Sequence, residues 1–199
     1  MRVLLTGFGP FPGVEQNPTA AVVHALAAEP APPGLQWAAE VLPVSWQHGE
    51  DALREALSSH RPAIALHLGV ATAADRLRVE RCAVAAAPPR PDALGTLPER
   101  PPPAARVGFD TEAVAAALCD DGLPAEASED AGAYLCNAVL GWSLVRSVEF
   151  GHRAAFLHVP MPGTARPDGG AWTESDLRRA ARRVVEFLAA VGAATSSRP

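Results

Sequence analysis

The chain has 199 residues, of which 48% are hydrophobic and 20% charged, so it can bury one substantial core within a single domain spanning residues 1–199. A formal net charge of −5, scattered along the chain, excludes the basic stripe that attracts nucleic acids. No segment approaches the roughly 20 consecutive apolar residues of a spanning helix, and Met1–Gly7 is too short for a secretory signal. We therefore expect a cytoplasmic protein without nucleic-acid or membrane partners.

Apolar strands alternate with helical segments from the first residues onward. Val3–Thr6 predicts a buried strand, and Asn17-Pro18 after a glycine-proline loop is a typical helix start. The further predicted strands are 37–44, 63–69, 76–80, 125–128 and 154–159. The predicted helices are 19–28, 47–59 with Ser45 as its cap, 111–120 with Asp110 as its cap, 133–148 and 173–191. This alternation favours a single-domain α/β/α sandwich with a mostly parallel central sheet flanked by helices.

Two segments are predicted to lie outside this pattern. Residues 88–105 contain seven prolines, which predicts a surface loop or flap rather than a helix or strand. The tail, residues 195–199, is expected to fray.

Cys136 is the cysteine most suited to chemistry. It follows a glycine turn near the start of the predicted helix 133–148, where free backbone amides and the helix dipole stabilise a thiolate and later an oxyanion. A free cysteine is also often a small core hydrophobe, and position alone does not decide between these interpretations. Cys82, assigned to the same strand as Glu80, and Cys119, on the apolar stripe of a helix, look inert; three thiols in such a chain are expected to be reduced.

His158 ends the predicted strand 154–159, and the carboxyl ends of parallel strands line the ligand crevice of α/β proteins. It could present a base there, although His67, also near a strand end, is a serious rival. The remaining histidines fall on predicted helices or their ends and are interpreted as surface or packing residues: His24, His48, His60 and His152.

Glu80 lies in an apolar neighbourhood, where a carboxylate is costly unless it is paired. A histidine is one possible partner. An ion pair with Arg78 or Arg81 at a sheet edge is the other, and spacing alone favours it.

Neither a nucleotide nor a metal is expected as a cofactor. Gly7-Phe8-Gly9 lacks the third glycine of a phosphate-binding loop, and its phenylalanine would crowd a pyrophosphate. The chain also lacks His-Glu-x-x-His and Cys-x-x-Cys spacing.

Four segments together resemble the pyroglutamyl peptidase I family of cysteine exopeptidases. The segments are Leu5–Gly13 with Asn17–Thr19, Glu80–Val84, Ala131–Asn137 and Phe156–Pro160. The resemblance implies that Cys136 is the nucleophile, His158 the general base and then acid, and Glu80 the group that orients the imidazole. It further implies removal of an N-terminal pyroglutamyl residue from peptides and assembly as a homodimer or homotetramer, for which the regions of Trp37, Trp142 and Trp172 could supply an interface.

The same resemblance implies a lactam pocket and an oxyanion contact. The pocket residues would be Phe8, Phe11, Val44, Tyr134 and Leu135. Phe8 and Phe11 could sandwich the flat ring, and an aromatic slot would reject a charged amino terminus. Arg90 matches an arginine near the scissile carbonyl and, with the Cys136 amide, could stabilise the oxyanion.

The chain departs from the family pattern in three places: Ala85 where asparagine is usual, Ala74 where arginine is common, and a shorter, less polar segment after Arg90. These departures motivate a second hypothesis, a thiol amidohydrolase for another cyclic amide or N-blocked amino acid. A third hypothesis is a catalytically idle descendant that binds N-blocked peptides or serves only as an oligomer subunit.

Overall fold

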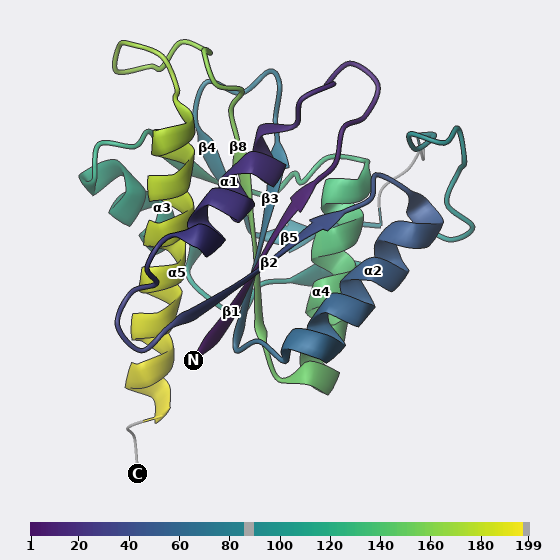
Figure 1. Ribbon diagram of the computed structural model, residues 1–199, viewed down its shortest axis with the longest axis horizontal. Helices are drawn as coiled ribbons and strands as arrows, with labels where there is room; N and C mark the ends of the chain where they lie inside the picture. Colours follow the sequence, from purple (N-terminus) through teal and green to yellow (C-terminus); the bar gives the residue numbers. More distant parts are fainter. Residues whose placement is uncertain (86–89, 197–199) are drawn as a thin grey trace.

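A computed structural model of the chain describes residues 1–85 and 90–196, which form one central sheet with helices on both faces (Figure 1). The six strands of this sheet, in the spatial order β2-β1-β3-β8-β4-β7, are β1 (Arg2–Phe8), β2 (Gln36–Leu42), β3 (Ile64–Val70), β4 (Leu77–Glu80), β7 (Ala125–Ser128) and β8 (Arg153–Val159). A separate two-stranded sheet joins β5 (Cys82–Ala83) to β6 (Ala105–Arg106). The helices are α1 (Pro18–Ala28), α2 (Trp46–His60), α3 (Thr111–Asp120), α4 (Leu135–Phe150) and α5 (Glu174–Ser196).

The sheet is mostly parallel, which confirms the predicted fold class. β1 pairs in parallel with β2 and β3, and β3 pairs in parallel with β8. β4 runs antiparallel to β8, and β7 pairs in parallel with β4. The start of β4 therefore lies at the same edge of the sheet as the carboxyl end of β8.

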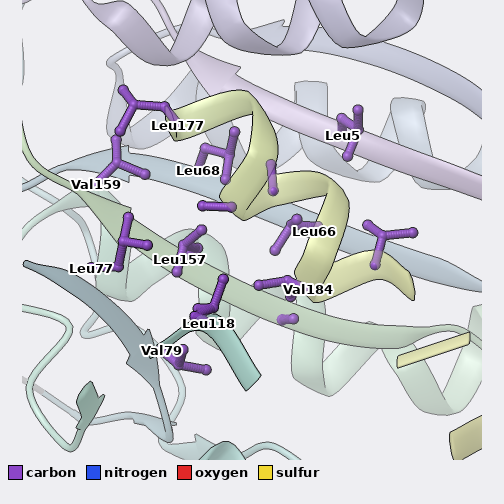
Figure 2. Close-up of a cluster of buried hydrophobic side chains, with 14 of the residues drawn as sticks. Leu5, Leu66, Leu68, Leu77, Val79, Leu118, Leu157, Val159, Leu177 and Val184 are labelled. Carbon is purple, nitrogen blue, oxygen red and sulfur yellow. The ribbon is translucent and has the colours of Figure 1, made fainter. Parts of the chain in front are cut away.

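Each face of the sheet has its own core. Alternating residues of the strands point to α1, α3 and α5 on one side, where Leu5, Leu157, Leu177 and their neighbours are buried (Figure 2). The opposite face, with Leu4 and Phe156 among its buried residues, is covered by α2 and α4, which lie side by side (Figure 1). Among the described residues, no helix combines the length and the apolar character that a bilayer crossing requires.

The predicted helix caps are present. Asn17 Oδ1 accepts the Thr19 amide at 3.2 Å, Ser45 Oγ accepts the His48 amide at 3.3 Å, and Asp110 caps α3 in the same way. These side chains satisfy amides that a helix leaves unpaired at its start. The helix 111–120 and the strand 125–128 have their predicted bounds.

Three predictions about local structure were wrong. Cys82 does not continue β4, because the backbone leaves the main sheet at Arg81. The Arg81 amide donates to the Ser128 carbonyl of the main sheet, whereas the Arg81 carbonyl accepts the Val107 amide beside β6. The helix predicted at 133–148 begins at Leu135, after a turn at Gly132 with φ of 80°. The helix predicted to end at residue 191 extends to Ser196; residues 197–199 of the expected frayed tail lie outside the described residues.

The proline-rich segment is fixed to the start of α2. Pro88 and Pro89 lie outside the described residues; from Arg90 to residue 104 no helix or strand is present, and Ala105 already belongs to β6. Asp92 Oδ2 accepts the Trp46 amide at 2.8 Å, while the Trp46 indole donates to the carbonyl of Arg90, also at 2.8 Å. These bonds hold Arg90 beside the carboxyl edge of the sheet.

Candidate active site

A pocket of about 540 Å³ opens where β1, β3 and β8 end. With the exception of Glu80, every residue that the resemblance assigned to the site lines this pocket: Phe8, Phe11, Val44, Arg90, Tyr134, Leu135, Cys136 and His158. Segments that are far apart in the sequence therefore meet at the place that an open α/β sheet offers to ligands.

Glu80 lies beneath the pocket and contacts His158. Its Oε1 is 2.7 Å from His158 Nδ1, and its side chain is fully buried. The contact arises because β4 and β8 are antiparallel neighbours, with Arg78 opposite His158 in the register and Glu80 two residues further along β4 on the same face. The imidazole is thereby held with Nε2 as the nitrogen available to the pocket.

The arginine pairing that spacing favoured for Glu80 is not what the structure shows. Arg78 Nε lies 3.5 Å from Glu126, and Arg81 pairs with Glu112 at 2.6 Å and with Glu129. A buried carboxylate is costly unless a partner compensates it, and His158 is the partner found for Glu80.

Cys136 is the second residue of α4 and faces the pocket. Tyr134, at the cap position, makes no side-chain hydrogen bond to the helix start among the described residues, so the first amides of α4 are not capped by its side chain. The sulfur fits against β3 because residue 69 is glycine: a Cβ there would lie 2.8 Å from Cys136 Sγ and 2.7 Å from the Phe156 ring.

The electrostatics couple Cys136 to His158. Burial alone would lower the pKa of His158, but the charge of the Cys136 thiolate, a hydrogen bond to that sulfur and the Glu80 carboxylate outweigh it and raise the pKa to about 9. The His158 imidazole is therefore held in its charged form beside the Cys136 sulfur at neutral pH.

Aromatic rings line the part of the pocket beside the start of α4 and the end of β1. The Phe11 and Tyr134 ring centroids are 6.4 Å apart, and Trp46 meets Tyr134 edge to face at 5.6 Å. Burial raises the pKa of the Tyr134 hydroxyl, which keeps this wall uncharged. Phe8 and Val44 are buried beside them. The result is an apolar slot next to the Cys136 sulfur.

Sequence reasoning missed several residues of the site. Gly69 gave no motif signal because its role is to leave space. Asn137 was quoted as part of a motif, but its function appears only in space: its side-chain amide exchanges hydrogen bonds of 2.9 and 2.8 Å with the Val84 backbone and ties the segment after β4 to α4. Two charged residues of the pocket wall were also missed, Asp75 and Glu126, which line it beside Arg76 and Arg78.

His67, the rival histidine, does not line the pocket. It lies within β3, fully buried, and its two ring nitrogens are 2.8 Å from Thr6 Oγ1 and from Ser143 Oγ. Ser143 also bonds His152, which is buried as well, so His152 is a packing residue as expected. The other cysteines lie elsewhere, with sulfur contacts to the carbonyls of Glu129 (Cys82) and Ala125 (Cys119).

Comparison with known proteins agrees with this geometry. The family model described as pyroglutamyl peptidase matches residues 1–168. The pyrrolidone-carboxylate peptidase of Streptomyces coelicolor is 38% identical over 179 residues, covering 85% of this chain and 82% of the relative; that of Pyrococcus furiosus is 36% identical, covering 80% and 81%.

Solved structures of pyrrolidone carboxyl peptidases have the same fold. The Pyrococcus furiosus structure superposes with a TM-score of 0.84 at 29% identity, covering 94% of this chain and 97% of that one. The Thermococcus litoralis structure gives 0.81 at 30% identity, covering 93% and 91%. The chain therefore belongs to the pyroglutamyl peptidase family of cysteine exopeptidases, as its four sequence segments predicted.

Proposed function

We propose that this chain hydrolyses the amide bond after an N-terminal pyroglutamyl residue of peptides, through a thioester on Cys136. The observation that carries the proposal is the placement of the Glu80–His158 pair, joined at 2.7 Å, beside a thiol at a helix start and next to an apolar aromatic slot. Family membership supports the substrate class, and the geometry supports the roles proposed for the residues.

In the first half of the reaction, the Cys136 thiolate attacks the pyroglutamyl carbonyl carbon. The oxyanion that forms is stabilised by the free amides at the start of α4, with the Arg90 guanidinium as a second donor. The His158 imidazolium gives its proton to the leaving nitrogen, the C–N bond breaks, and the shortened peptide departs with a new amino terminus.

In the second half, neutral His158 takes a proton from water, and the resulting hydroxide attacks the thioester carbon. The C–S bond breaks, pyroglutamate leaves, and the thiolate and imidazolium are restored together. Glu80 keeps Nδ1 protonated throughout and stabilises the charged ring, which is the role of the carboxylate in a catalytic triad.

The aromatic slot favours a lactam over an ordinary amino terminus. A pyroglutamyl ring is flat and carries no ammonium group, so it can be buried between Phe8, Phe11 and Tyr134 without an unpaired charge. An ammonium terminus in the same place would lose its hydration and gain no partner from these side chains. Part of the selectivity for the lactam therefore comes from the exclusion of charged amino termini.

The test is a pyroglutamyl-anilide assay on the wild type and on Cys136→Ser, with Cys119→Ser as the matched control because that thiol is exposed and remote from the pocket. We expect activity in the wild type and the control and none in Cys136→Ser. Iodoacetamide labelling followed by mass spectrometry should modify Cys136, and pyroglutamate should protect it. Undiminished activity in Cys136→Ser would reject Cys136 as the nucleophile.

Two alternatives make different predictions in the same assay. A thiol amidohydrolase for N-blocked amino acids would turn over acetyl-aminoacyl anilides faster than the pyroglutamyl anilide. A binding descendant would turn over neither. Family membership and the intact Cys136, His158 and Glu80 set favour neither alternative.

We also propose that the protein acts in the cytoplasm as a homodimer or homotetramer. The side chains of Trp142 and Trp172 are buried in the chain itself and Trp37 is half-buried, so in the first two of these expected regions an interface would have to use neighbouring residues. Exposed apolar side chains lie instead on α4, at Val145 and Val148, and in the proline-rich segment, at Leu94 and Leu97. Sedimentation analysis of the wild type and of Val148→Glu tests this assembly: a wild type that sediments as a monomer would contradict it.

A further inference from the structure

The pocket wall farthest from the aromatic slot carries four charged side chains that the reaction at Cys136 does not use. This charged wall consists of Asp75, Arg76, Arg78 and Glu126. Arg76 Nε lies 3.0 Å from Asp75 and 3.8 Å from Glu126, and Arg78 Nε lies 3.5 Å from Glu126. These groups come from β4, β7 and the loop before β4, on the opposite side of the site from the slot.

The order of the strands places the catalytic groups between the slot and the charged wall. Phe8 ends β1, Cys136 lies against Gly69 of β3, His158 is on β8, Arg78 is on β4 and Glu126 is on β7. These strands occur in that same order across the sheet. A substrate whose lactam ring fills the slot and whose carbonyl carbon meets Cys136 must therefore direct its leaving peptide past His158 toward Arg78.

Arg78 is the arginine of the wall whose only ionic contact among the described residues, with Glu126 at 3.5 Å, is too long for a strong hydrogen bond. It stands directly opposite His158 in the β4–β8 register, so both side chains are on the same face of the sheet. Its Nε is buried and has no hydrogen-bond partner among the described residues, whereas Arg76 is bonded to Asp75. The wall itself holds two arginines and two carboxylates, and Arg90 elsewhere in the described pocket lining adds one further positive charge.

We propose that the charged wall is the leaving-side subsite, where Arg78 binds a carboxylate on the residue that follows pyroglutamate. A planar guanidinium matches a carboxylate in a two-point hydrogen bond, and the contact of Arg78 with Glu126 is a longer ion pair of 3.5 Å rather than such a bond. The carboxylate can come from an acidic side chain or from the free carboxyl terminus of a pyroglutamyl dipeptide. This inference rests on the proposed function.

The test compares kcat/KM within two matched pairs of substrates. Pyroglutamyl-glutamyl-amide against pyroglutamyl-glutaminyl-amide measures the side-chain carboxylate, and pyroglutamyl-alanine against pyroglutamyl-alanine-amide measures the terminal one. We expect the acidic member of at least one pair to be favoured by about tenfold, because hydrogen bonds between charged groups are the strong ones. Added salt should reduce the preference, since Arg78 is partly exposed.

Variants assign the preference to Arg78. Arg78→Gln should abolish it, Arg78→Lys should weaken it by removing the two-point geometry, and Arg54→Gln, which removes an exposed arginine of α2 outside the pocket, should leave it unchanged. The ratio within a pair is the readout, so a general loss of activity in a variant cancels.

The outcomes separate this inference from the proposed function. Equal kcat/KM within both pairs in the wild type would overturn the subsite and leave the peptidase function intact, as would a preference that persists in Arg78→Gln. Should Arg78→Gln fail to fold, the wild-type ratios and Arg78→Lys still decide. Failure to cleave any of the four substrates, the neutral ones included, would overturn both proposals.

Discussion

Acidification should destabilise this protein through two buried histidines outside the active site. His67 and His152 are joined through Ser143 by hydrogen bonds of 2.8 and 3.0 Å. Burial lowers the pKa of His67 to about 3, with a smaller effect from His152, and burial lowers the pKa of His152 to about 4 despite its bond to Ser143. Both rings therefore remain neutral in the folded protein at pH 5.

The unfolded chain behaves differently. There both histidines titrate near 6.5, so between pH 7 and pH 5 the unfolded state takes up protons that the folded state does not bind. Stability present above pH 6.5 is thus lost as the pH falls. At pH 5, about 1.5 units below the unfolded pKa, each histidine costs about 2 kcal/mol, and the two together cost about 4 kcal/mol. That is a large share of the roughly 5–15 kcal/mol that stabilises a typical domain.

Urea unfolding at pH 7 and pH 5 of the wild type and of the double variant His67→Gln/His152→Gln isolates this effect. Carboxylates and His158 titrate in both proteins and cancel in the comparison, so the wild type should lose about 4 kcal/mol more than the variant between the two pH values. The single variant His152→Gln should show about half the difference, and His24→Gln, at an exposed position, should show none. An equal loss in the wild type and the double variant would refute the reasoning.

Four further outcomes follow from the site. Glu80→Gln should lower kcat by about 10²–10⁴-fold, as loss of the carboxylate charge does in related triads, and an unchanged kcat would contradict the assigned role. Because the pKa of His158 is raised to about 9, its charged ring should persist through neutral pH, and the activity that needs its proton should be lost as the pH rises through 9; a rate that continues to rise there would contradict this. Gly69→Ala places a Cβ 2.8 Å from Cys136 Sγ, so we expect a loss of about 1–3 kcal/mol in urea unfolding together with reduced kcat. Asn137→Ala removes both hydrogen bonds to the backbone after β4 and should cost about 1–3 kcal/mol, measured in the same way; wild-type stability would indicate that those bonds are dispensable.

Local signals in the sequence determined most of the secondary structure, and together with the family motifs they indicated the candidate site residues. Asn17, Ser45 and Asp110 marked helix starts because their side chains satisfy amides that any helix exposes, whatever it packs against. His158 could be placed at a strand end because an apolar run stops there. The family motifs then selected Cys136, whose position alone left its function undecided.

Tertiary structure alone decided which of these residues meet. Spacing along one strand favoured an arginine partner for Glu80. However, β4 lies antiparallel beside β8, and this pairing of distant segments places the Glu80 carboxylate against His158. The same pairing brought Arg78 to the pocket, and the need for space beside a sulfur explained Gly69. Strand order and close packing depend on contacts between residues far apart in the chain, which no local pattern encodes.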